Sequence, residues 1–483
     1  RMKLFDTATL LGSIANNPIS KEIVGKLASK CPVDRKSYLE VGLDIYLGKR
    51  QDACLKCKAS AKSLGLILDE TIKALGISKD ALIDTFQLDL FERGLLSVLK
   101  GISKFGVRKS FVSGAPFLVV WDITNKCNLN CKHCYSGSGM GMRKELSFSE
   151  VKIGIDKLFD SGISLIAFSG GEPLMRKDFF EILQYCTDIG MAVSVASNGT
   201  LITKEVASKL KDFGVWNVQI SLDGKDAYTH DMFRGVNGAF DRTVEGIKNV
   251  VEAGIYTSVA TTITKDNLED VPELIEFVQG LGAQSIISYN FIPTGRGKFI
   301  AKNDIAPEDR ENLLRYLYKE NKCINLEIVS TAPQFGRVAL QEETGSEKEF
   351  IPTHFFNTPK VGPLEKISEF IGGCGAGRLY CAIRANGDID PCVFMPITIG
   401  NILTDDFEKI WDENEVLNNL RNKEAVKGNC GKCDYRHYCG GCRARAYAYY
   451  GDYMAPDPGC KWNSSLFEEI LNESEIEIGV ISK

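Results

Sequence analysis

The sequence lacks the features of exported, membrane-spanning and nucleic-acid-binding proteins. It contains no apolar run of roughly 18 residues, the length needed to cross a bilayer, and no secretory-type signal at its N-terminus. Its net charge of -5 and sequence pI of about 5.7 predict no general affinity for nucleic acid. With 483 residues, 44% of them hydrophobic, the chain can form one large or about two to three ordinary globular domains. We therefore expect a cytoplasmic protein with a substantial core.

Cysteine, by contrast, is abundant. The chain has 16 cysteines, and most of them fall into short groups in three parts of the sequence. Without a secretory signal, such groups favour thiolate ligation of metals in a reducing compartment over disulfide bonds. The sequence therefore predicts metal centres.

The most informative group is Cys127, Cys131 and Cys134, which follow the apolar run 117–124. Three thiolates this close can hold one metal centre, and three ligands leave one coordination position open. A structural zinc site would need four ligands, and neither a fourth cysteine nor a suitably spaced histidine follows. The spacing therefore indicates a reactive soft-metal centre.

A second motif, at residues 170–173, ends the next apolar segment. Gly170 and Gly171 let the backbone approach a ligand closely, and the Glu172 carboxylate can accept a hydrogen bond from an ammonium group. Together with the cysteine loop, this stretch resembles the radical SAM superfamily. The resemblance implies that the three cysteines bind a 4Fe-4S cluster whose open iron binds S-adenosylmethionine (SAM). It also implies that the methionyl amine of SAM is held by Gly170, Gly171, Glu172 and Pro173.

Short apolar segments alternate with helical segments between residues 115 and 322. The pattern predicts strands near 117–124, 163–168, 191–197, 215–222, 256–263 and 284–292, and helices near 148–160, 178–189, 203–213, 239–253, 268–281 and 307–321. Six such units predict an α/β fold with a parallel sheet and right-handed crossovers. The family resemblance sharpens this to a partial (β/α)6 radical SAM barrel over residues 111–322.

Polar residues occur where the predicted strands end, which is the functional edge of such barrels. Ser197 and Asn198 follow the third strand, and Ser221 and Asp223 follow the fourth. Their side chains are expected to hydrogen-bond the ribose and carboxylate of SAM. Helix caps or turns are the alternative for any one of them.

Three further residues complete the expected SAM site. Tyr135 follows the last loop cysteine, and Ile292 opens a segment that resembles the family segment flanking the adenine. Arg234 is expected in a loop after the fourth strand, where it would clamp a carboxylate of SAM or substrate. A surface arginine without such a role is an equally good interpretation.

Residues 1–110 are predicted to form a helical domain, since apolar residues recur at helical spacing in 8–27, 61–75 and 81–99. This domain contains Cys31, Cys54 and Cys57. Two interpretations stay open for them. They form a further metal site with a fourth ligand from elsewhere, such as Cys323, or they are ordinary thiols.

The segment 88–107 is predicted to be a basic amphipathic helix, with Arg93, Lys100, Lys104 and Arg108 on the side opposite its apolar residues. One interpretation places it on the inner membrane surface, with its cations near anionic headgroups. The other packs it on the barrel with a solvated basic face.

Residues 323–373 interrupt the β/α pattern. Their four prolines predict an irregular connection that covers the barrel mouth and contacts substrate.

Residues 374–483 contain eight cysteines at metal-like spacings, which two zinc ribbons would explain by spacing alone. The pattern, with Gly387 five residues before Cys392, resembles the SPASM domain of many radical SAM enzymes. The resemblance implies an inner 4Fe-4S cluster on Cys374, Cys381, Cys392 and Cys442, and an outer one on Cys430, Cys433, Cys439 and Cys460. Cys439 and Cys442 are separated by two residues instead of the commonest three.

The resemblance therefore implies an oxidoreductase with three 4Fe-4S clusters, bound SAM and a low-potential electron donor of the flavodoxin or ferredoxin type. A cluster with four protein ligands has no open iron, so the auxiliary clusters are expected to carry electrons. The radical derived from SAM would take hydrogen from an unactivated carbon of a hydrophobic or amphiphilic substrate.

Two features of the chain point to different substrates. Residues 439–460 resemble the enzymes that modify propionates in haem biosynthesis, whereas the N-terminal domain and the basic helix favour a substrate met at a membrane. We expect carbon-carbon coupling of membrane lipid chains, with tetrapyrrole side-chain modification as the alternative and peptide or protein maturation third. An electron carrier without SAM chemistry is a further interpretation, against which the intact 170–173 motif argues.

Overall fold

The computed structural model describes residues 27–34, 36–75, 89–106, 108–139, 144–342, 350–352, 357–359 and 372–473. The helix expected at 8–27 lies almost entirely outside these residues, as does much of the connection 323–373.

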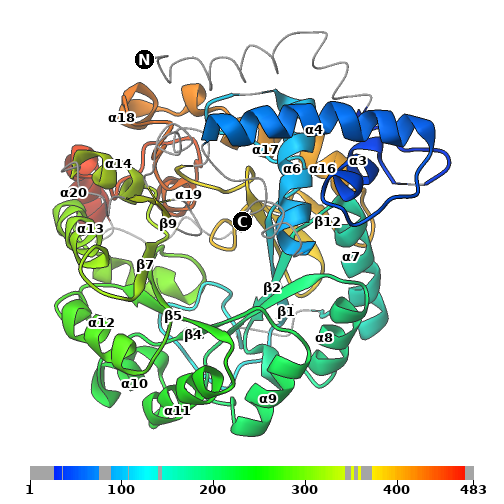
Figure 1. Cartoon of the computed structure of the whole chain (residues 1–483). Coiled ribbons are helices and arrows are strands. Elements are labelled where there is room, and N and C mark those ends of the chain that lie inside the picture. Colours follow the sequence, from blue (N-terminus) through cyan, green and yellow to red (C-terminus); the bar gives the residue numbers. More distant parts are fainter. Residues whose placement is uncertain are drawn as a thin grey trace.

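A parallel sheet encircled by helices forms the centre of the fold (Figure 1). Its strands β1 to β6 are parallel and adjacent in chain order, and the predicted helices connect them. The strands are β1 (Leu118–Thr124), β2 (Leu165–Gly170), β3 (Ala192–Ser197), β4 (Asn217–Ser221), β5 (Tyr256–Ile263) and β6 (Ser285–Asn290). The helices are α7 (Phe148–Ser161), α8 (Phe179–Asp188), α9 (Lys204–Asp212), α11 (Ala239–Glu252), α12 (Val271–Gly280) and α13 (Pro307–Asn321). The α/β barrel prediction is therefore confirmed.

The helix α7 illustrates how local sequence sets these elements. Ser147 and Glu150 form a reciprocal capping box at its start, and Gly162 ends it with a φ of 90°, a conformation that favours glycine. Between these caps, Gly154 lies against Trp121 of β1, where an added Cβ would come within 2.5 Å of the indole. The helix therefore packs directly on the strand that leads into the cysteine loop.

The sheet extends beyond the six predicted strands at both edges. β7 (Glu327–Ser330) pairs parallel with β6, and β10 (Tyr380–Ile383) pairs parallel with β1. Two antiparallel strands, β11 (Asp388–Asp390) and β12 (Gly400–Asn401), continue from β10. The prediction of an irregular connection from residue 323 was wrong for its first part, because β7 and α14 (Gln334–Gln341) form there. The cysteine-rich region thus shares a sheet with the first barrel strand.

The remaining elements surround the sheet. A short hairpin pairs β8 (Phe350–Pro352) with β9 (Asn357–Pro359). The helix α10 (Ala227–Arg234), which the sequence did not predict, ends at Arg234, so the loop position expected for that residue was wrong. The cysteine-rich region carries α16 (Phe407–Glu413), α17 (Glu415–Arg421), α18 (Gly428–Lys432), α19 (Arg443–Tyr450) and α20 (Ser464–Glu473).

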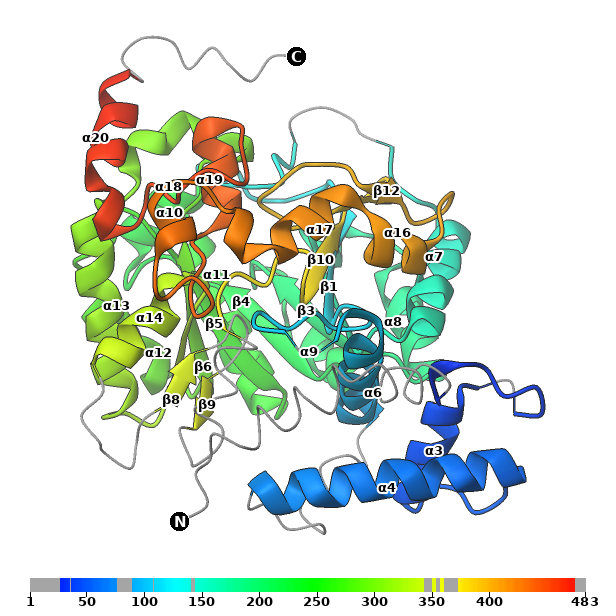
Figure 2. The same cartoon turned by 90° about the horizontal axis from the view of Figure 1, so that it is seen from above.

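The N-terminal helices α3 (Tyr38–Tyr46) and α4 (Leu55–Leu75) lie at one margin of the molecule, next to α6 (Asp89–Phe105) (Figure 2). Leu95, Leu96 and Leu99 of α6 pack against the apolar core of this module. The opposite face of α6 contacts the barrel, where Ser97 Oγ donates to Ala115 O at 2.6 Å and Arg93 Nε donates to Ile163 O at 2.7 Å. Both faces of the amphipathic helix therefore contact other parts of the protein.

The cations proposed to meet a membrane have partners within the molecule. Lys100 lies 3.8 Å from Glu40, and Lys104 lies 2.7 Å from Asp412. Arg108 donates to Arg421 O at 2.6 Å. The polar face of α6 is therefore partly packed on the barrel and paired within the molecule, while Lys104 stays exposed.

In the part of the chain that the structure describes, no helix is both long enough and apolar enough to span a membrane.

Candidate functional site

A cavity of about 220 Å³ lies at the carboxyl ends of strands β2 to β6, under the cysteine loop. Most of the residues expected at the SAM site line it, so the structure brings together groups that are far apart in sequence. The predicted residues in its wall are Cys127, Cys131, Cys134, Tyr135, Gly170, Gly171, Ser197, Asn198, Ser221, Arg234 and Ile292. Glu172, Pro173 and Asp223 are not among the lining residues.

Gly170 and Gly171 let the second motif pack closely against the backbone that enters the cysteine loop. Gly171 N donates to Thr124 O at 2.8 Å, and Glu172 N donates to Lys126 O at 2.7 Å. An added Cβ would lie 2.4 Å from Thr124 O at Gly170 and 2.1 Å from Lys126 O at Gly171. Both glycines are therefore required by a close approach of two backbone segments, besides lining the cavity.

Replacing Gly171 by alanine should displace the cysteine loop and reduce the iron bound there. The methyl group would overlap Lys126 O, which is backbone and cannot move without the loop. We expect the reconstituted variant to lose up to about four irons per chain, one cluster's worth, together with SAM cleavage. The matched control is Gly280→Ala at the end of α12, where nothing lies within 4 Å of an added Cβ. Full iron content and full cleavage in Gly171→Ala would contradict this role.

Glu172 was expected to contact SAM, but its side chain does not line the cavity. Its carboxylate is fully buried and accepts hydrogen bonds from Ser197 Oγ at 2.9 Å and from Asn198 N at 2.8 Å. Burial raises the pKa of Glu172 to about 7, although these hydrogen bonds favour its charged form. Glu172 therefore ties the 170–173 motif to the end of β3 and sets the position of Ser197 and Asn198. Pro173 is likewise buried, as the first residue of a short 3-10 turn.

Asp223 and Arg234 form a buried ion pair beneath the cysteine loop. Arg234 Nη2 lies 2.6 Å from Asp223 Oδ2, and its Nη1 donates to Cys131 Sγ at 3.6 Å. Asp223 Oδ1 accepts from Thr262 N at 2.8 Å. Burial raises the pKa of Asp223, and Arg234 only partly offsets this shift. Asp223 was expected to line the cavity and to hydrogen-bond the ribose or the carboxylate of SAM. Instead, it pairs with Arg234, and Arg234 in turn contacts the cysteine loop.

The segment expected to flank the adenine also supports the cysteine loop. Arg296 N donates to Cys134 O and Arg296 Nε donates to Cys131 O, both at 2.9 Å. Gly295 has a φ of 58°, and an added Cβ would lie 2.3 Å from Tyr135 O. The loop is therefore fixed from both sides of the barrel mouth.

The cavity wall also contains residues that the sequence did not single out, among them His133, Gln219, Tyr289 and Phe394. Tyr289 donates to Gln219 Oε1 at 3.2 Å across the inside of the barrel. The signal that could have found this pair is a polar side chain at an inward position of an otherwise apolar strand. The ring of His133 stacks on that of Phe233 with 4.2 Å between the ring centres, and burial lowers the pKa of His133 well below its usual range.

The outer set of cysteines converges as expected. Cys430, Cys433, Cys439 and Cys460 all line one small cavity of about 20 Å³. Asp457 N donates to Cys430 Sγ at 3.3 Å, and Gly441 N donates to Cys439 Sγ at 3.4 Å. Four thiols around one small space fit a closed metal centre with backbone donors to its sulfurs.

The inner set converges only in part. Cys374, Cys392 and Cys442 belong to one buried cluster, and Tyr380 completes it by donating from its hydroxyl to Cys392 Sγ at 2.7 Å. Cys381 lies on the other face of β10, within the barrel core. Successive side chains of a strand point to opposite faces, so Tyr380 and Cys381 cannot both face this cluster. The expected placement of Cys381 with the inner set is therefore wrong in this structure.

A second cavity, of about 280 Å³, adjoins the first and shares Tyr135, Ser136 and Val393 with it. It lies between the cysteine loop and the strands β10 and β11, and its wall includes Lys298 and Arg384. Tyr135 stands at the junction, with its hydroxyl donating to Asp122 at 2.9 Å and its ring against Phe394 at 5.1 Å. The two cavities therefore meet at Tyr135, beside the cysteine loop.

Family models match two parts of the chain. The model described as "Radical SAM superfamily" matches residues 121–278, and the SPASM model, described as "Iron-sulfur cluster-binding domain", matches residues 374–434.

Curated relatives match over most of their length. The chain is 38% identical to an AdoMet-dependent heme synthase of Methanosarcina barkeri over 351 residues, covering 72% of this chain and 97% of the relative. It is 30% identical to an Fe-coproporphyrin III synthase of the same organism, covering 71% and 87%. It is 31% identical to the mycofactocin maturase MftC of Mycolicibacterium smegmatis, covering 74% and 86%.

Among solved structures, the fold is similar to that of Streptococcus suis SuiB bound to S-adenosylmethionine. The TM-score is 0.61 at 19% identity, covering 84% of this chain and 90% of that one.

Proposed function

Because this chain belongs to the radical SAM superfamily and carries a SPASM domain, we propose that it modifies a side chain of a tetrapyrrole. It is a radical SAM enzyme whose cofactors are 4Fe-4S clusters and SAM. The observation that carries the substrate proposal is the match to a heme synthase across 97% of that relative. The relatives favour this tetrapyrrole alternative over the expected coupling of lipid chains, which gains no support from them.

The donor sets fit the cofactors. We assign the first cluster to Cys127, Cys131 and Cys134, whose loop borders the 220 Å³ cavity. We assign the outer auxiliary cluster to the four cysteines around the small cavity. When bound, the first cluster and SAM supply one electron and a carbon radical that can take hydrogen from an unactivated C–H bond. The hydroxyl and amide groups of Ser197, Asn198, Ser221 and Gln219 line the cavity and would orient SAM.

The second cavity is suited to a carboxylated side chain. Lys298 and Arg384 give its wall two cations, and Arg384 is already paired with Asp390, Nη2 lying 2.7 Å from Oδ1. Lys298 Nζ lies over the Phe299 ring at 5.1 Å. We therefore assign Lys298 to a propionate carboxylate. The packed rings of Tyr135 and Phe394 would separate the reacting carbon from water.

Peptide maturation is the second candidate, since the relative MftC is named a mycofactocin maturase. It differs from the tetrapyrrole proposal in the substrate that should stimulate SAM cleavage.

An anaerobic turnover assay separates these functions. The reconstituted protein would be incubated with dithionite, SAM and either an iron porphyrin carrying propionates or candidate precursor peptides. We expect 5′-deoxyadenosine to form faster with the porphyrin, and the porphyrin to change in mass. Cys127→Ala should form none. If a peptide and no porphyrin stimulates SAM cleavage, peptide maturation replaces the tetrapyrrole proposal. If neither stimulates it, both substrate proposals are contradicted.

Lys298 gives a sharper version of this assay. Lys298→Gln should raise KM for the porphyrin about fivefold, corresponding to roughly 1 kcal/mol for a partly exposed ion pair, with little change in uncoupled SAM cleavage. Lys302→Gln is the matched control, because Lys302 is exposed on the same segment and does not line the cavity. Equal KM values for the two variants would contradict the role of Lys298.

A further inference from the structure

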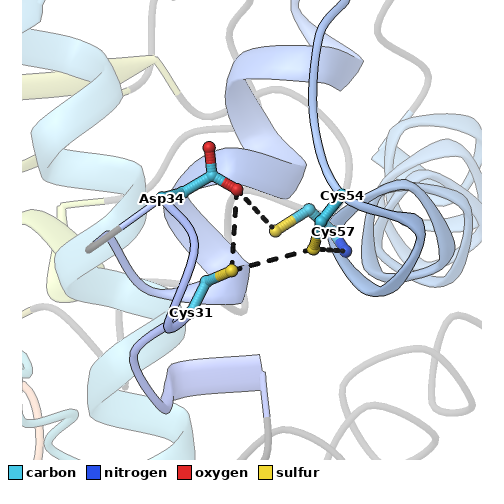
Figure 3. A group of neighbouring side chains, drawn as sticks. All are labelled: Cys31, Asp34, Cys54 and Cys57. Atoms are coloured by element: carbon cyan, nitrogen blue, oxygen red, sulfur yellow. Dashed lines mark hydrogen bonds between the residues drawn. The ribbon is translucent and has the colours of Figure 1, made fainter.

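The N-terminal module brings three cysteines and an aspartate to one point (Figure 3). Cys31 and Asp34 come from the turn before α3, and Cys54 and Cys57 come from the start of α4. One ligand atom from each residue lies within 4.8 Å of all the others. Cys323, suggested by the sequence as a fourth ligand, is exposed and is not a member of this group, so that expectation was wrong.

The spacing of these atoms matches four ligands around one small ion. Zinc-sulfur bonds of about 2.3 Å and zinc-oxygen bonds of about 2.0 Å in a tetrahedron place two sulfurs about 3.8 Å apart and an oxygen about 3.5 Å from a sulfur. Here Cys31 Sγ lies 3.7 Å from Cys54 Sγ. Asp34 Oδ2 lies 3.5 Å from Cys31 Sγ and 3.4 Å from Cys57 Sγ. A 4Fe-4S cluster spreads its ligands over four irons and would need a wider arrangement.

The surroundings orient the ligands. Arg50 pairs with Oδ1 of Asp34 and thereby turns Oδ2 toward the thiols. Cys57 N donates to Cys54 Sγ at 3.4 Å, and Cys31 N donates to Lys36 O at 2.7 Å, which closes the turn. Cys31 and Cys57 are buried. Such outer contacts are typical of metal ligands, whose positions they fix.

We propose that Cys31, Asp34, Cys54 and Cys57 bind one structural Zn²⁺ ion. Four protein ligands close the coordination sphere, which excludes substrate and makes the ion structural. The ion links the turn before α3 to the first turn of α4. Because Glu40 of α3 contacts Lys100 of α6, and α6 packs on the barrel, the ion would stabilise the docking of the whole module.

A disulfide between Cys31 and Cys54 explains the group less well. A sulfur-sulfur bond is about 2.05 Å long, and the two sulfurs are 3.7 Å apart. It would also leave the carboxylate of Asp34 directed at sulfur atoms with no cation between them.

Zinc and iron content of the full-length protein tests the proposal. The protein would be produced with added Zn²⁺, purified anaerobically, freed of loosely bound metal with a chelator, and measured by mass spectrometry of the metals. We expect one zinc per chain in the wild type and in Cys323→Ser, an exposed-cysteine control, and none in Cys57→Ser. Wild-type protein without zinc, or equal zinc in Cys57→Ser, would overturn the proposal, as would iron in place of zinc at this site.

A second measurement needs no variant. X-ray absorption at the zinc edge of the wild-type protein should show three sulfurs and one oxygen, with zinc-sulfur distances of about 2.3 Å. A shell of four sulfurs, or of nitrogen and oxygen alone, would overturn the assignment even if the Cys57 variant does not fold.

Discussion

Replacing Arg234 by methionine is expected to destabilise the folded protein by about 3–5 kcal/mol, the usual cost of removing one partner from a buried ion pair. Asp223 has no exposed surface, and the arginine lies 2.6 Å from its carboxylate. In the variant this carboxylate keeps the hydrogen bond from Thr262 N, but it loses its nearby cation. Methionine fills most of the space of the arginine side chain. The lost stability therefore reports the unpaired charge of Asp223 and not a new cavity.

The same substitution should also disturb the cysteine loop. Arg234 Nη1 donates to Cys131 Sγ, and this contact is lost, whereas methionine keeps the main-chain carbonyl that accepts from Asn130 N at 3.1 Å. We therefore expect a lower thermal midpoint, and SAM cleavage reduced by about tenfold in the anaerobic assay, since even the fraction that folds lacks the arginine contact to Cys131 that helps to position the loop.

Two further variants test whether loss of the ion pair causes the drop in stability and in SAM cleavage. Arg242→Met replaces an exposed arginine on the neighbouring helix α11 and should leave both properties unchanged. Adding Asp223→Asn to Arg234→Met removes the stranded charge and should restore part of the lost stability, but not the cleavage. An Arg234→Met protein as stable as the wild type would show that the ion pair contributes no net stability.

The sequence alone was sufficient for the barrel because its signals are local and repeat. Each predicted strand is a short apolar run, and caps such as Ser147 with Gly162 mark where a helix begins and ends. β7 and β10 were missed because they are short and lie outside that repeat; they become strands by pairing with β6 and β1. Such pairing depends on segments distant in the chain.

The sequence brought the cysteine loop and the polar strand ends together, but it did not give the directions of their side chains. The cysteine loop and the polar strand ends meet at one cavity as expected. However, sequence does not reveal which side chains point into it: Glu172 and Asp223 support neighbouring residues instead. Similarly, the two faces of α6 were distinguished correctly, but nothing local shows that the polar face meets the barrel. Asp34 was missed because its role depends on a turn folding onto α4.

Loss of Cys392 should remove the inner auxiliary cluster, whereas loss of Cys381 should leave it in place. Cys392 lies among Cys374, Cys442 and the Tyr380 hydroxyl. Cys381 contacts the barrel core with no exposed surface. We expect reconstituted Cys392→Ala to bind about four fewer irons per chain. Cys381→Ala should keep its iron and lose only some stability, because a buried thiol is replaced by a smaller group. Iron and sulfide analysis with Mössbauer spectroscopy measures both.

This comparison decides what the inner cluster can do. If iron falls equally in both variants, β10 rearranges to bring Cys381 to the cluster, four thiolates close it, and it can only carry electrons. If Cys381→Ala keeps its iron, three thiolates hold the cluster and one iron is left for Tyr380 or for a bound molecule. Tyr380→Phe then distinguishes these cases. An unchanged Mössbauer spectrum means that the phenol only donates a hydrogen bond to Cys392, and a changed iron site means that it is a ligand.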